Sequence, residues 1–146
     1  MAKFSTGLRN TMLGSQSFRD ALNGGELRIY AGTAPATADD AVGASTLLVT
    51  LTVDGLGGGL NFSATPENGT ISKESSEVWK GTVAATGNAA WFRFAAAGDT
   101  GNNNAAALRI QGTIGATGTD MLVANQLLTE TEEFILNYFV VALPTL

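Results

Sequence analysis

Apolar and polar residues alternate along most of the chain from Glu26 onward. In "TLLVTLTVD" every second residue from Leu47 to Val53 is apolar, so these side chains share one face of an extended strand. Similar runs continue to "EFILNYFVVALP", and turn-forming pairs such as Asn68-Gly69 and Gly87-Asn88 separate them. This pattern predicts an all-β domain over residues 26–146, a β-sandwich or jelly-roll-like fold of eight or nine short strands.

The first 25 residues have a different period and predict a short helix or an arm. "STGLRNTMLGSQSFRDALNGG" places Leu8, Met12, Phe18 and Leu22 at helical spacing, and Ser5 or Thr6 can cap the segment. Gly14 interrupts the stripe, so the segment is two short helical pieces or one bent helix. Its apolar side packs on the chain's own domain or on a neighbouring molecule.

Two strands carry apolar or aromatic residues on both faces. In "AAWFRFAAAG", Phe92 and Phe94 share one face, while Trp91 and Arg93 share the other. The last strand has one set of apolar residues on the core face and a second set on the opposite face. The core set is Phe134, Leu136, Tyr138, Val140 and Ala142, and the opposite set is Ile135, Phe139, Val141 and Leu143.

A strand that is apolar on both faces must be covered on both. The second cover would be the N-terminal helix or a neighbouring subunit, because such a patch exceeds what monomers usually expose. We therefore expect a protein interface, with identical subunits in permanent contact. Its expected residues are Leu8, Met12, Phe18, Trp91, Arg93, Ile135, Phe139 and Val141.

Composition narrows the classes of function. The 146 residues suit one domain, and the charged share of 14% is low for a soluble domain. The net charge is −5 and the basic residues are scattered, which disfavours nucleic-acid binding. The chain has no cysteine and no histidine, so we expect no disulfide, no transition-metal site and no cofactor. The longest apolar run, 139–143, is too short to span a bilayer.

Candidate catalytic and binding groups are few. Without histidine, a serine nucleophile lacks its ordinary base, and the carboxylates at Asp39-Asp40 and in "TETEE" have no apolar pocket to separate their pKa values. "GDTGNNN" lacks the spacing of a calcium loop. We therefore expect no enzymatic activity. Aromatic residues could form a sugar-binding platform or fill the core, and the core is favoured; they are Tyr30, Trp79, Trp91 and Tyr138.

Three stretches together resemble a family of small virion structural proteins of tailed bacteriophages. "STGLRNTML" followed by "LRIYAGTAPATADDAVGASTLL" is similar to that family's N-terminal helix and its R-I-Y-x-G-x-x-P-x-x-A-D loop. "GTVAATGNAAWFRF" resembles its A-x-G-x-A-x-W-F-R segment. "IQGTIGATGTDMLVANQLLTE" resembles its G-x-(V/I)-G-x-(S/T)-G-x-D-(L/M) segment before a final apolar strand. The resemblance covers nearly the whole chain.

The resemblance implies a structural role without catalytic residues. It favours a capsid decoration (cement) protein or another head-associated accessory protein, in contact with the major capsid protein or with neck and tail proteins. A neck or collar protein, a tail or fibre-attachment protein, and a carbohydrate-binding β-sandwich module are the alternatives. The expected location is the virion, assembled in the cytoplasm of the bacterial host, with no membrane or nucleic-acid partner.

Overall fold

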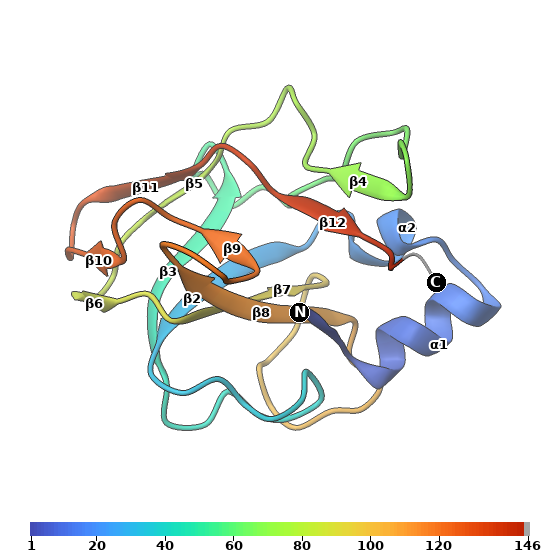
Figure 1. Cartoon of the computed structure of the whole chain (residues 1–146), viewed down its shortest axis with the longest axis horizontal. Helices are drawn as coiled ribbons and strands as arrows, with labels where there is room; N and C mark the ends of the chain where they lie inside the picture. The colour runs from blue at the N-terminus through green and yellow to red at the C-terminus, as the bar shows by residue number, and fades with distance from the viewer. Residues whose placement is uncertain (145–146) are drawn as a thin grey trace.

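Strands make up most of the regular structure in the computed structural model, which describes residues 1–144 (Figure 1). The helices are α1 (Thr6–Gly14) and α2 (Phe18–Leu22). The twelve strands of the described residues are β1 (Lys3–Phe4), β2 (Glu26–Ala31), β3 (Thr46–Val53), β4 (Thr70–Ser72), β5 (Trp79–Thr82), β6 (Gly87–Asn88), β7 (Trp91–Ala95), β8 (Arg109–Gly115), β9 (Met121–Leu122), β10 (Leu127–Leu128), β11 (Glu133–Leu136) and β12 (Val140–Ala142). The predicted all-β, sandwich-like class is confirmed, with more and shorter strands than expected.

The largest sheet has the strand order β1-β8-β7-β2-β3-β5-β11, and the pairings along it are antiparallel. β9 pairs with β8 in parallel, beside β1. In the centre of the sheet, Leu27 lies opposite Phe94 and Ile29 lies opposite Phe92. All four side chains are buried, as the alternation in these strands predicts.

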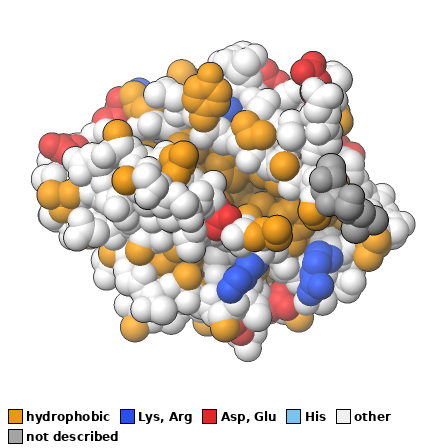
Figure 2. All heavy atoms as spheres, viewed as in Figure 1, with side chains coloured by type: hydrophobic (Ala, Val, Ile, Leu, Met, Phe, Trp, Pro, Cys, Tyr) orange, Lys and Arg blue, Asp and Glu red, His pale blue; other side chains and the backbone are white. Residues whose placement is uncertain are grey.

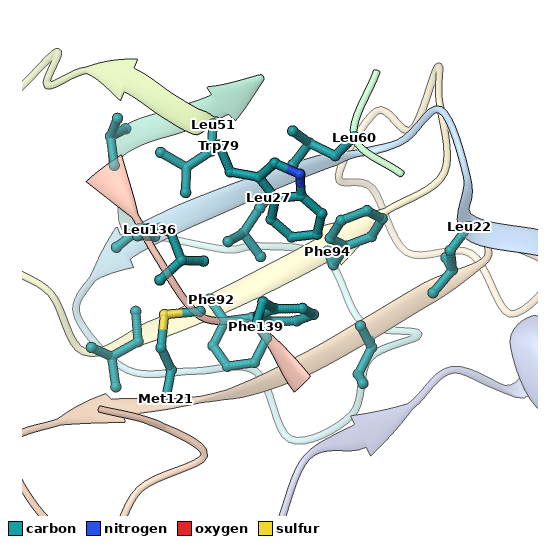
Figure 3. Close-up of a cluster of buried hydrophobic side chains, with 14 of the residues drawn as sticks. Leu22, Leu27, Leu51, Leu60, Trp79, Phe92, Phe94, Met121, Leu136 and Phe139 are labelled. Atoms are coloured by element: carbon teal, nitrogen blue, oxygen red, sulfur yellow. The ribbon is translucent and has the colours of Figure 1, made fainter. Parts of the chain in front are cut away.

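The second layer consists of two small sheets, β4 with β12 and β6 with β10, and of the chain between them. Aromatic side chains join the two layers. The ring centroid of Phe139 lies 5.6 Å from that of Phe92 (Figure 3). The centroid of Phe62 lies 5.1 Å from that of Phe94. Trp79 is fully buried among them. Close tilted and edge-on contacts of this kind are the favoured aromatic geometry.

The N-terminal segment forms two helical pieces, and they pack on the chain's own core. The Ser5 side chain accepts a hydrogen bond from the Leu8 N–H and caps α1, which ends at Gly14. Leu8 and Leu22 are fully buried, and Phe18 packs against Phe62 with ring centroids 5.2 Å apart. The predicted helical stripe and its interruption are confirmed, and residues 1–25 share the core of the β domain.

The predicted last strand is two strands that belong to different sheets. β11 pairs with β5, whereas β12 pairs with β4, and residues 137–139 connect them. The connection shifts the alternation by one position, because Leu136 is buried before it and Phe139 and Val141 are buried after it. The face assignment is therefore wrong beyond residue 136: Phe139 and Val141 belong to the core, and Tyr138 and Val140 are exposed.

A β-bulge changes the face assignment in β3 as well. Ile29 pairs with Val49, but the next residue, Tyr30, pairs with Leu47, so Leu48 is an extra residue. Leu48 is fully buried and Leu47 is exposed, the reverse of the prediction.

The two turn predictions have different outcomes. Asn68 and Gly69 both have positive φ, 50° and 74°, in a tight turn between Glu67 and Thr70, as predicted. Gly87-Asn88 does not join a hairpin: it forms β6, which pairs with β10, and β2 and β3 lie between β5 and β7 in the sheet. The Gly87-Asn88 prediction is therefore wrong, because a turn-forming pair can also lie within a strand.

Candidate functional site

A groove of about 930 Å³ opens where the N-terminal segment, β9 and the C-terminal strand β12 come together. Side chains of the hydrophobic core form its floor, among them Phe92, Ile110 and Phe139. Its walls come from β1, α1, β9 and residues 138–144. Figure 2 shows this hollow, with hydrophobic side chains visible inside it from the solvent. The core is therefore open to an apolar partner on this side.

Large apolar side chains on the rim of the groove are exposed. The exposed fraction is 87% for Leu13, 83% for Tyr138 and 65% for Leu122. Val140 and Leu143 on the same rim are about half exposed. Clustered apolar exposure around a concave surface is typical of a binding site. Each such side chain contributes about 1.5–3 kcal/mol when fully buried, so a partner gains affinity by covering them.

The charged side chains that line the groove are Arg9 and Asp120. The Asp120 carboxylate accepts hydrogen bonds from the Thr113 N–H (2.9 Å) and hydroxyl (3.0 Å), and the Met1 amino group lies 3.2 Å away. Burial raises the pKa of Asp120, but the hydrogen bonds and the amino group outweigh burial and hold it below the ordinary 3.8. The groove is therefore mostly apolar, with one ionised carboxylate and one arginine at its wall, as is typical of a surface that binds a partner.

Loop 32–45 of the same chain covers the opposite face of the main sheet. Trp91 is fully buried there, stacks on Tyr30 at 4.3 Å between centroids, and donates a hydrogen bond from Nε1 to the Ser45 hydroxyl. Gln111 donates from Nε2 to the Pro35 carbonyl at 2.9 Å. Neither the helix nor a neighbouring molecule is needed to cover this face.

Arg93 lies beneath this loop with neutral partners. It is 2% exposed, and its Nε and Nη2 donate to Oε1 of Gln111 at 3.2 and 2.6 Å. Its guanidinium stands 5.5 Å from the centroid of the Trp91 ring. Burial lowers the pKa of Arg93, and the nearby charge of Arg109 lowers it further. Among residues 1–144, Nη1 of Arg93 has no hydrogen-bond partner.

A buried ion pair between Arg109 and Asp99 fastens the loops on this face. Nε and Nη2 of Arg109 donate to Oδ1 of Asp99 at 3.0 and 2.6 Å. Nη1 also donates to the Ala38 carbonyl at 3.1 Å, and Nη2 donates to the Asn102 carbonyl at 2.7 Å. The "GDTGNNN" loop is thus held by an arginine. Among residues 1–144, no three aspartate or glutamate side chains lie close enough together to hold a metal ion.

The neighbouring carboxylates Asp39 and Asp40 also hold loop 32–45 in place. Asp39 accepts hydrogen bonds from the N–H and the hydroxyl of Thr6, at 2.8 and 2.7 Å, in the first turn of α1. These bonds lower the pKa of Asp39, and a negative charge at a helix N-terminus is favourable. Asp40 accepts a hydrogen bond from the Thr37 N–H at 2.8 Å.

The structure brings together some of the residues predicted for the interface. Met12, Phe139 and Val141 line the groove. Leu8 and Phe18 are buried inside the molecule, and Ile135 is half exposed on β11, outside the groove. Trp91 and Arg93 are covered, as expected, but the cover is loop 32–45 of the same chain and not the N-terminal helix or a neighbouring subunit. The sequence of loop 32–45, mostly small and polar residues, does not indicate that this loop covers a face of the sheet.

Four rim residues were not predicted: Leu13, Leu122, Tyr138 and Val140. Leu13 and Leu122 each follow a methionine, and in both pairs the methionine packs against the core while the leucine is exposed. The sequence does not show which member is exposed, because adjacent apolar residues can share one core, as Ala21 and Leu22 do. The break between β11 and β12 moves Tyr138 and Val140 to the exposed face, and no local sequence pattern marks this break.

The alternative of an aromatic platform for sugar finds little support among residues 1–144. Tyr30, Trp79 and Trp91 are each less than 5% exposed, and Tyr138 alone of the four candidates is accessible. The prediction that these aromatics fill the interior is confirmed for the three buried residues. Within residues 1–144, neither helix has the length and apolar character that a membrane crossing requires.

No family model, no curated protein and no solved structure matches this chain. The similarity to bacteriophage virion proteins therefore stays a prediction from sequence motifs. The groove is the feature of the described structure that most directly indicates a function.

Proposed function

We propose that this chain is a non-enzymatic structural protein of a tailed bacteriophage particle, and that it acts through protein–protein contacts. A capsid decoration protein or another head-associated accessory protein is the role that the motif resemblance favours. The observation that carries the proposal is the open apolar groove with Leu13, Leu122 and Tyr138 exposed on its rim. The proposed partners are the major capsid protein or neck and tail proteins, and further copies of this chain.

A protein partner suits this groove better than the other ligand classes. The net charge of −5 and the scattered bases disfavour nucleic acid, since phosphates are bound by clustered lysine and arginine. The burial of Tyr30, Trp79 and Trp91 weakens the carbohydrate-binding alternative. Apolar surface that is kept in water needs a partner that covers it for the life of the particle, which is typical of permanent assemblies.

The test is the amount of this protein in purified particles of the phage that encodes it. Quantitative mass spectrometry should find the chain in a fixed ratio to the major capsid protein. A ratio near that of the shell subunits supports decoration, and a far smaller fixed ratio supports the neck or tail alternative. Absence of the chain from purified particles contradicts the proposal.

A matched pair of variants tests the groove itself. Leu13→Lys places a charge on the groove rim, and Leu56→Lys makes the same change at an equally exposed leucine (87% for both) outside the groove. Particles lacking the protein are incubated with each purified variant and then sedimented. We expect Leu13→Lys to lose binding and Leu56→Lys to bind like the unmodified chain. Equal binding by both variants argues against the groove as the contact.

A further inference from the structure

Two strand edges line the apolar groove, and both direct backbone groups away from their own sheets. β12 pairs with β4 on one side, and its other side borders the groove. β1 is the edge strand of the main sheet and lines the opposite wall. An unpaired strand edge is a template for a further strand.

The hydrogen-bond pattern shows which backbone groups of β12 are involved. Lys73 N–H donates to the Phe139 carbonyl and Leu143 N–H donates to the Gly69 carbonyl, so the odd-numbered residues face β4. In an antiparallel pair the alternate residues direct their N–H and C=O groups to the other side. Val140 and Ala142 therefore present these groups to the groove side of β12.

The same reasoning applies to the opposite wall. Ser5 N–H donates to the Arg109 carbonyl, so the odd-numbered residues of this segment bond to β8. Phe4 consequently directs its N–H and C=O away from the main sheet. No backbone hydrogen bond links Val140, Ala142 or Phe4 to another of residues 1–144 on these outer sides.

We infer that the groove binds an extended apolar segment of another polypeptide, which adds as a strand to the edge of β12. The inference rests on the proposed use of the groove as a protein contact. An extended segment supplies both things that the site lacks: backbone partners for the strand edge, and alternate apolar side chains for the floor. A helix satisfies its own backbone groups, and a flat face of a second copy does not reach a concave floor.

The charges of the groove add one feature to the segment. Asp120 is ionised, and the Met1 amino group 3.2 Å away compensates its charge. Arg9 donates to the Thr6 hydroxyl at 3.0 Å, and no carboxylate of residues 1–144 lies within 4 Å of its guanidinium. Arg9 thus brings a positive charge to the groove that has no direct carboxylate contact among these residues, with Asp39 near it only through the shared Thr6 hydroxyl, so the bound segment carries an aspartate or glutamate beside its apolar residues.

The probe is a synthetic eight-residue peptide of alternating valine and threonine that ends in aspartate. Binding is followed by NMR, through the amide signals of Phe4, Val140 and Ala142 and their protection from hydrogen exchange. We expect saturable binding that protects the Val140 and Ala142 amides. The same peptide with alternate amides N-methylated should bind at least about tenfold more weakly, because it loses several backbone hydrogen bonds.

A proline substitution tests the strand edge in the protein. Ala142→Pro removes one outward N–H, which a solvent-facing strand edge tolerates, and Ala142→Val keeps it. We expect about fivefold weaker binding for Ala142→Pro and none of that loss for Ala142→Val. With both peptides amidated at the C-terminus, Arg9→Gln should weaken binding of the peptide that ends in aspartate and leave a peptide that ends in asparagine unchanged.

Three other results overturn the inference. Equal binding of the methylated peptide indicates apolar filling without strand addition. Concentration-dependent dimers with protected Val140 and Ala142 amides indicate a second copy as the occupant. If no peptide binds while Leu13→Lys still loses particle binding, strand addition fails and the proposed function stands. If the peptide binds as expected but the chain is absent from particles, the proposed function fails and strand addition stands.

Discussion

Arg93 and Arg109 are both buried on the loop-covered face, but we predict opposite sensitivities to substitution by methionine. Arg109 is fully buried and paired with Asp99, whose side chain is 8% exposed. Arg109→Met leaves a buried carboxylate without its cation and removes the bonds to the carbonyls of Ala38 and Asn102. Breaking a buried pair from one side costs about 3–5 kcal/mol of unfolding free energy.

Arg93→Met removes a buried charge that has no ion pair with any carboxylate of residues 1–144. Its cost is the unpaired Oε1 of Gln111, about 1–3 kcal/mol, and the removal of a desolvated guanidinium offsets that cost. We therefore expect the unfolding free energy to change by no more than about 1.5 kcal/mol.

Equilibrium unfolding in urea, followed by tryptophan fluorescence and circular dichroism, measures both variants. Combining Asp99→Ala with Arg109→Met should cost less than the sum of the single changes, because the pair is coupled. The reasoning is refuted if Arg93→Met destabilises the protein as much as Arg109→Met does. It is also refuted if Arg109→Met costs less than about 1 kcal/mol, since the buried pair would then contribute little.

Three further predictions concern the rest of the fold. The pKa of Asp39 is lowered from 3.8, so its stabilising effect is complete above that pH and is lost as the pH falls through the lowered value. In Asp39→Asn, the unfolding free energy should therefore fall less steeply with decreasing pH in the acid range. Gly81→Ala should cost about 2–3 kcal/mol in urea unfolding, because its Cβ would meet the Thr50 carbonyl oxygen, and an unchanged midpoint would contradict this close approach. Phe139→Ala should lower the unfolding free energy by about 3–5 kcal/mol, and Tyr138→Ala should lower it by less than about 0.5 kcal/mol. Equal losses would contradict the assignment of Phe139 to the core and Tyr138 to the surface.

Local patterns determined much of the secondary structure. The alternation in β2 and β7, the capped and interrupted N-terminal helix, and the Asn68-Gly69 turn were all readable, because each depends on residues within one element. The all-β class followed from the same patterns. The absence of histidine and cysteine from the sequence also limited the chemistry of any site before the fold was known.

The tertiary structure decided which apolar residues are covered, and by what. Alternation gives a face only while a strand continues, so the break after Leu136 and the bulge at Leu48 each moved residues to the other face. The cover over Arg93 is a loop held by bonds between residues far apart in the chain, as in the bond from Gln111 to Pro35, which no local pattern encodes. The groove arises in the same way, because its walls come from the two ends of the described chain and from β9. Their meeting depends on how the whole chain packs.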